Sequence, residues 1–245
     1  YNVTVAYNSL GANTTAGYNT AVGTYALETN TTGPQNVAIG YEAMEANTTG
    51  GYSVAVGMRA LEANTTAHNN CAVGYYALNA NTTGTYNCAI GENTLTNNTT
   101  ASHNTCVGSR SLVLNTTGQY NSALGYYSLY SNTTGNANTA LGTYALDANT
   151  TASNNTAIGT YTLSANTTGA EHTAVGDNAL HSNTTGHYNT AVGRVALYLN
   201  TTGTANTAVG HNSLRYSTTA SYNTAVGQSV LYANTTGASN TGIGY

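Results

Sequence analysis

The most specific chemical signal in this 245-residue sequence is the tripeptide Asn-Thr-Thr, which recurs at regular intervals. Asn-x-Thr is the acceptor for N-linked glycosylation, which modifies surface loops of secreted proteins. An Asn followed by Thr also suits a tight turn, because its side chain can bond its own backbone. We therefore predict either a row of N-glycans or a row of turn-forming asparagines. The candidate positions are Asn13, Asn30, Asn47, Asn64, Asn81, Asn98, Asn115, Asn132, Asn149, Asn166, Asn183, Asn200 and Asn234, and Ser217 interrupts the row.

Other reactive side chains are few, and their spacing predicts no catalytic or metal site. The chain has four Lys or Arg, eight Asp or Glu and a net charge of −4, with Asp147 and Asp177 as its only aspartates. The six His residues fall at several repeat positions, and no Cys-x-x-Cys, Gly-x-Ser-x-Gly or phosphate-binding glycine loop occurs. We expect no enzymatic activity, no cofactor, no metal and, without a basic surface, no nucleic-acid partner.

Cysteine and tyrosine offer two weaker signals, each with two interpretations. Cys71 and Cys88 lie one repeat apart and either form a disulfide or fill small spaces, as Cys106 does. Tyrosines recur before and after the same pentapeptide. Their rings are predicted to stack either on one another or on sugars. Examples are Tyr18, Tyr52, Tyr86 and Tyr120 before the pentapeptide and Tyr75, Tyr76, Tyr126 and Tyr127 after it.

The elements that position these residues follow from a repeat of 17 residues. Residues 18–33 read YNTAVGTYALETNTTG, and residues 188–203 read YNTAVGRVALYLNTTG. The spacing holds without insertion for about fourteen units. We therefore predict a single repeat solenoid over residues 1–245, either a fragment of a longer fibre or a subunit that assembles end to end.

Each unit is predicted to form one coil of an all-β, parallel β-solenoid. The Asn-Thr-Ala-Val-Gly segment suits a short strand that ends at Gly23 and its equivalents, and Asn30–Gly33 suits a turn with left-handed backbone angles. The aliphatic residues of the strand and the following Leu are predicted to form an inward core ladder, represented by Val22, Leu27, Ile39, Val56, Leu61, Val73 and Leu78. The strand alanines would then face outward and let coils of partner chains pack side by side.

The pentapeptides Asn19–Gly23 and Asn36–Gly40 make the repeat resemble the head repeats of trimeric autotransporter adhesins and the repeats of phage tail-fibre proteins. The resemblance covers the whole chain. It implies a left-handed parallel β-roll of three chains that serves adhesion or acts as a rod-like spacer.

These features favour a structural protein that forms an extracellular or virion-surface fibre, either bare or coated with glycans. Its expected partners are further copies of itself, side by side or end to end, together with covalent glycans if the Asn-Thr-Thr positions are acceptors. No window holds the roughly 20 apolar residues that span a bilayer. The alternatives are an adhesin or tail-fibre module that binds host glycans or surfaces, and an ice-binding solenoid that displays Thr14, Thr31, Thr48 and their successors.

Overall fold

The computed structural model describes residues 1–245 as two compact units, Tyr1–Asn121 and Ser122–Tyr245. The protein is all-β, and each strand is three residues long. The first unit holds β1 (Val3–Val5), β2 (Thr20–Val22), β3 (Val37–Ile39), β4 (Val54–Val56), β5 (Cys71–Val73), β6 (Cys88–Ile90) and β7 (Thr105–Val107). The second holds β8 (Ser122–Leu124), β9 (Thr139–Leu141), β10 (Thr156–Ile158), β11 (Thr173–Val175), β12 (Thr190–Val192), β13 (Thr207–Val209), β14 (Thr224–Val226) and β15 (Thr241–Ile243).

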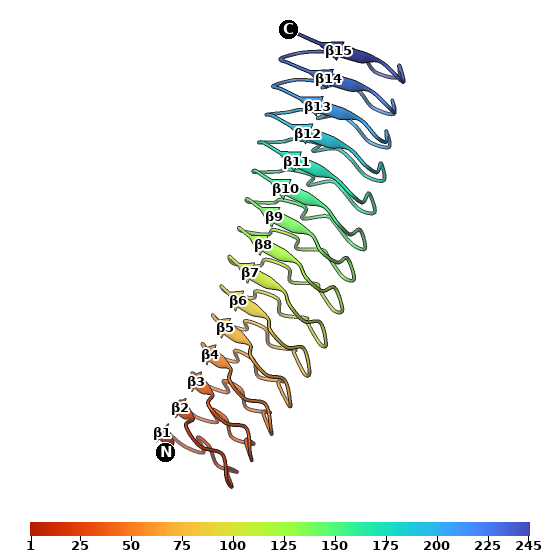
Figure 1. Cartoon of the computed structure of the whole chain (residues 1–245). Helices are drawn as coiled ribbons and strands as arrows, with labels where there is room; N and C mark the ends of the chain where they lie inside the picture. Colours follow the sequence, from red (N-terminus) through yellow and green to blue (C-terminus); the bar gives the residue numbers. More distant parts are fainter. The chain divides into compact units, whose positions relative to one another are not determined.

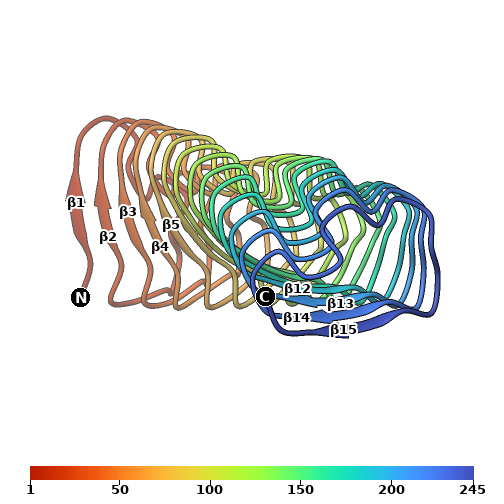
Figure 2. The same cartoon turned by 90° about the horizontal axis from the view of Figure 1, so that it is seen from above.

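Within each unit, successive strands pair in parallel without any shift of register. Thr156 of β10, for example, lies between Thr139 of β9 and Thr173 of β11, each 17 residues away. Figure 1 shows the strands of each unit stacked in chain order, and Figure 2 shows that each coil carries its strand on one side. The predicted parallel β-solenoid with one 17-residue coil per repeat is confirmed. The single-solenoid organisation, the handedness and the trimer stay predictions.

The interior of each coil is made by alanine and leucine, which corrects half of the predicted core ladder. Leu27, Leu61 and Leu78 are fully buried, as expected. The strand alanines are buried as well, whereas the aliphatic residue that follows each of them points outward, and Ile39 is 39% exposed. The predicted inward positions of Val22, Ile39, Val56 and Val73 are therefore wrong, and so is the outward alanine row.

The last coil shows how little space the opposite wall leaves the strand where that wall carries a valine. At Gly242, which replaces the strand alanine in β15, an added Cβ would lie 2.7 Å from Cγ1 of Val230 and 3.2 Å from Cγ of Leu231 on the opposite wall. A Val or Ile side chain does not fit in such a space without moving that wall. The leucines fill the interior, and the strand contributes only a methyl group.

The backbone turns sharply on both sides of this core. Gly23, which ends β2, has a φ of 134°, and a Cβ there would lie 2.4 Å from the carbonyl oxygen of Gly40. The predicted role of this glycine is confirmed. Leu27 also has a positive φ, 53°, in the turn that delivers its side chain to the core. Asn30 and Gly33 do not have the left-handed angles that the sequence predicted for them.

Candidate functional site

The Asn-Thr-Thr corner is a ladder of buried side-chain amides. Nδ2 of Asn47 donates to Oδ1 of Asn30 in the preceding coil, at 2.7 Å, and to the carbonyl oxygen of Gly50 in its own turn, at 2.9 Å. Asn64 repeats the same two bonds one coil further on. The bond within the turn is the one that the sequence predicted.

A second amide ladder runs beside the first, formed by the asparagine that precedes each strand. Oδ1 of Asn19 accepts the backbone N–H of Asn36 at 2.8 Å, and Nδ2 of Asn19 donates to the carbonyl oxygen of Gly33. That oxygen also accepts Nδ2 of Asn30. The two ladders thus meet at one carbonyl per coil, and polar side chains occupy space that apolar residues fill in most protein cores.

This geometry removes the corner asparagines as glycan carriers in the folded coil. Eleven of the thirteen predicted sites, from Asn30 to Asn200, have fully buried side chains, and only Asn13 and Asn234 in the terminal coils are half-buried. A glycan on Nδ2 replaces one of two hydrogens, and both are donated within the solenoid, as at Asn47. The alternative interpretation, a row of turn-forming asparagines, is the one that the structure supports.

Each amide ladder is interrupted in the second unit. Ser217 replaces the corner asparagine, and Oδ1 of Asn200 and Oγ of Ser217 are both buried without a partner. His172 replaces the strand-preceding asparagine and reproduces its bonds, because its Nδ1 accepts the backbone N–H of Asn189 at 3.1 Å. Burial lowers the pKa of His172 to about 4, so the ring is neutral near pH 7.

The two threonines of each corner differ in their contacts. The hydroxyl of the first donates to a backbone carbonyl of the next coil, as Thr31 does to Thr48 at 3.0 Å. Because these hydroxyls are bonded within the solenoid, the row of Thr14, Thr31 and Thr48 is not the free hydroxyl array that ice binding requires. The second threonine, represented by Thr32, is exposed, and its hydroxyl has no partner in the protein.

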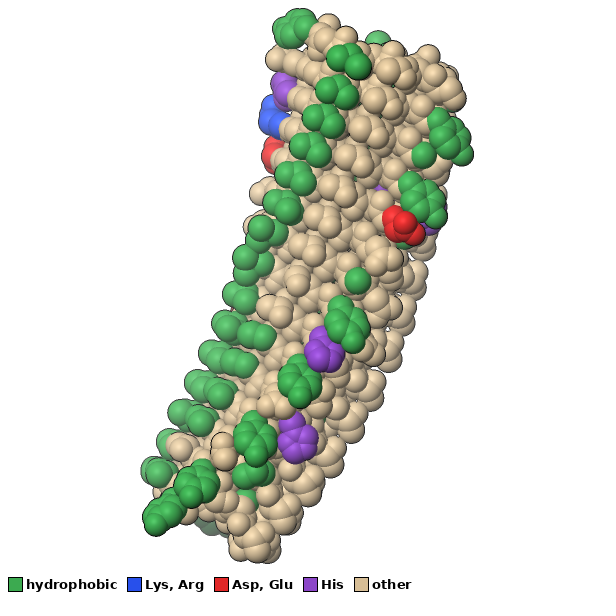
Figure 3. Space-filling model, viewed as in Figure 1, with side chains coloured by type: hydrophobic (Ala, Val, Ile, Leu, Met, Phe, Trp, Pro, Cys, Tyr) green, Lys and Arg blue, Asp and Glu red, His purple; other side chains and the backbone are tan.

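The outer face of the strands carries the residues on either side of each buried alanine. The aliphatic residue at the end of each strand is partly exposed, for example 46% at Leu124, and hydrophobic side chains form rows on the face shown in Figure 3. Cys71 and Cys88 lie in register on this face as free thiols, half-buried, whereas Cys106 is fully buried. Burial raises the pKa of the Cys88 thiol, with a smaller effect of Cys71 beside it.

Some rings of the tyrosine rows stack on neighbouring rings, while others, such as Tyr18, stay mostly exposed. The rings of Tyr86 and His103 are stacked at 5.2 Å, and those of His103 and Tyr120 at 5.0 Å, each pair within 4° of parallel. The rings of Tyr144 and Tyr161 form a similar pair in the second unit. Tyr86 and Tyr120 both stack on His103 and stay more than half exposed, so packing along the solenoid uses part of each ring and leaves the rest accessible.

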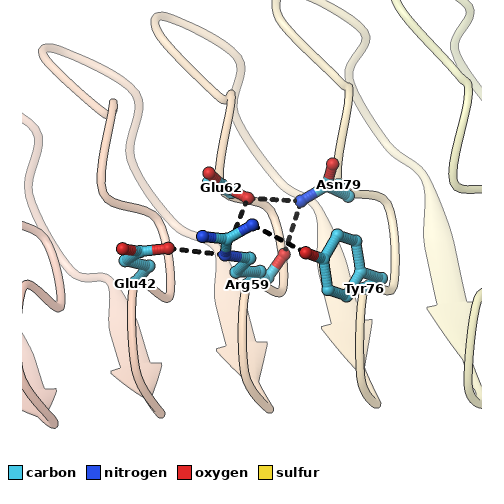
Figure 4. Close-up of polar contacts among 5 residues, drawn as sticks. All are labelled: Glu42, Arg59, Glu62, Tyr76 and Asn79. Carbon is cyan, nitrogen blue, oxygen red and sulfur yellow. Dashed lines mark hydrogen bonds and ion pairs between the residues drawn. The ribbon is translucent and has the colours of Figure 1, made fainter.

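A group of charged residues, which the sequence analysis missed, lies on the first unit (Figure 4). The Arg59 guanidinium pairs with Glu42, bonds the Tyr76 hydroxyl at 2.7 Å and lies 3.8 Å from Glu62. Carboxylate oxygens of Glu42, Glu45 and Glu62 lie within 4.8 Å of one another, and burial raises the pKa of Glu45. The signal was available, because Glu45 and Glu62 are 17 residues apart. Such a group could attract a divalent cation, but Arg59 already supplies positive charge to it.

No protein-family model, no curated protein and no solved structure matches this chain. The structure also contains no helix long and apolar enough to cross a membrane.

Proposed function

We propose that this protein is a structural element of an extracellular or virion-surface fibre. The proposal rests on the hydrogen-bond partners of the polar side chains. The side chains of Asn19, Asn47 and Thr31 bond to neighbouring coils, and the equivalent residues repeat these bonds along each unit. The hydrogen bonds of the repeat hold one coil on the next, as expected of a protein whose role is to form a continuous rod.

The organisation of the surface agrees with this role. Charged residues make up 5% of the chain, and in the group on the first unit Arg59 pairs with Glu42 and Glu62. The hydroxyls of Thr31 and its equivalents are bonded within the solenoid, which counts against ice binding by that row, and the stacking of Tyr86 on His103 favours packing for part of the tyrosines. We place the fibre outside the cell or on a virion, assembled from several copies of this chain without a cofactor.

Imaging the source of the protein tests this proposal. Antibodies raised against the folded chain, coupled to gold particles and applied to intact cells or virions, should label filaments at the surface or in the surrounding medium. The extracellular fraction should contain the chain in assemblies that sediment far faster than a 25.1 kDa monomer. Label confined to the cell interior, or a folded chain that is only monomeric, would contradict the proposal.

A further inference from the structure

The second threonine of each corner is the one position of the repeat that is exposed in every unit and never changes. It is Thr15, Thr32, Thr49, Thr66, Thr83, Thr100, Thr117, Thr134, Thr151, Thr168, Thr185, Thr202, Thr219 and Thr236. The position two residues before each strand, which is Tyr18 in the repeat of β2, is also exposed almost throughout, yet it varies among Tyr, Gln, Asn, His, Ala, Glu and Ser. Because that exposed position has diverged among the copies, duplication of the repeat does not by itself explain why the second threonine is constant.

Packing does not explain the constant second threonine either. The neighbouring first threonine is constant because its hydroxyl bonds the next coil, as Thr184 does to Thr201 at 3.1 Å. The hydroxyl of Thr185 donates to nothing in the protein, and a valine there would keep the β-branched shape. A hydroxyl that is always present, always exposed and never bonded points to a covalent modification of its oxygen.

We propose that these threonines are O-glycosylated and that they carry the coat that the buried asparagines cannot carry. The inference rests on the proposed extracellular fibre. A chain with only 5% charged residues needs another source of solubility, and sugars on a regular row of corners supply it. Adjacent acceptors are one coil apart, about 4.8 Å, which leaves room for about one sugar ring per coil. We therefore infer short, unbranched glycans.

The covalent step needs a glycosyltransferase and a sugar activated as its nucleoside diphosphate. Oγ1 of the threonine attacks the anomeric carbon, so an O–C bond forms while the bond between that carbon and the phosphate oxygen breaks. The nucleoside diphosphate leaves with the electron pair, and the hydroxyl proton passes to a base of the transferase.

Mass spectrometry of the chain purified from its natural source tests the inference. After denaturation, chymotrypsin cuts at the Leu and Tyr residues that flank the corners, and electron-transfer fragmentation assigns each added mass to one residue. We expect added sugar masses on Thr32, Thr185 and their equivalents, none on Asn30 or Asn183, and their release by alkaline β-elimination. Sugar masses on the asparagines, or unmodified threonines throughout, would overturn the inference.

Two variants of the full chain, produced in the same source, separate modification from folding. Thr185→Val should lose one glycan and leave the unfolding midpoint of the enzymatically or chemically deglycosylated chain unchanged. Thr184→Val should keep the glycan on Thr185 while lowering that midpoint, because it removes the hydroxyl bonded to Thr201. A Thr185→Val chain with the full complement of sugar would overturn the inference. Filaments that carry bare threonines would overturn it while leaving the fibre proposal intact.

Discussion

The side-chain oxygen of Asn200 is buried without a hydrogen-bond partner because the next coil carries Ser217 instead of an asparagine. Asn200 itself donates normally to Asn183, at 2.8 Å. The serine therefore interrupts the ladder on both sides, because Oγ of Ser217 has no partner either and Nδ2 of Asn234 bonds only Gly237 in its own turn.

Restoring that link should stabilise the protein. Ser217→Asn provides an Nδ2 donor for Oδ1 of Asn200 and should raise the free energy of unfolding by about 1–3 kcal/mol. Asn166→Ser creates a similar gap elsewhere in the same unit and should lower it by a similar amount. Denaturant unfolding followed by circular dichroism measures both changes. If Ser217→Asn left the unfolding free energy unchanged, the corner ladder would not be a source of stability.

Because the strand alanines are buried, substitutions at neighbouring residues of β10 should differ sharply in their effect on stability. Ala157→Leu forces a large side chain between the two walls and should destabilise the protein by about 1–3 kcal/mol. Thr156→Leu adds similar bulk on the outer face and should change the stability by about 0.5 kcal/mol or less. Thermal unfolding of the two variants shows which residue faces the core. A larger loss of stability for Thr156→Leu than for Ala157→Leu would mean that the aliphatic residues of the strand face inward after all.

Gly242 and Val230 compensate each other in size. Gly242→Ala should lower the stability of the last coil, since the new methyl group would lie 2.7 Å from Cγ1 of Val230. Combining it with Val230→Ala, the residue found at this position in many other coils, should recover much of the loss. A double-mutant cycle read by hydrogen exchange in β15 should give a favourable coupling of about 0.5–3 kcal/mol, whereas strict additivity would exclude the contact.

His172 should make the second unit sensitive to acid. Its pKa is lowered from 6.5 to about 4 in the folded protein, so the unfolded chain binds the proton more readily. The contribution to stability is complete above about pH 6.5 and is lost as the pH falls toward 4, a change of about 3 kcal/mol. Asp147, whose pKa burial raises to about 6, acts in the opposite direction, since its contribution is lost as the pH rises through 6.

The variant His172→Asn isolates the histidine from Asp147. It restores the amide that other coils carry, as in the bond from Asn155 to Gly169 at 3.1 Å. Unfolding midpoints measured from pH 7 to pH 4 should fall less for His172→Asn than for the parent chain. Equal slopes would mean that His172 is not held neutral in the folded protein.

Much of the fold could be predicted from the sequence because the repeat leaves few alternatives. The 17-residue period required one coil per unit, and a leucine in nearly every unit marked Leu27 and its equivalents as core. Alternation along a strand showed that Ala21 and Val22 face opposite sides, but it did not show which side is inside. The usual preference for burying the larger residue gave the wrong answer, because the leucines fill the interior and the strand alanines are buried with them.

The candidate site was harder to predict, since one pattern served two roles. Asn-Thr-Thr is both a glycosylation acceptor and the sequence of a turn whose amide bonds its own backbone and the next coil. Only the burial of Asn47 and its equivalents separates the two. Left-handed backbone angles at residues such as Leu27 could not be expected from residue type, because a branched side chain rarely adopts them.

Cryo-EM of the assembled particles at side-chain resolution tests the account most directly. We expect filaments in which 17-residue coils stack in register, with bare asparagine side chains buried at the corners and extra density on the exposed second threonine. Particles without filaments, or filaments in which the corner asparagines point into solvent and carry branched density, would contradict the account.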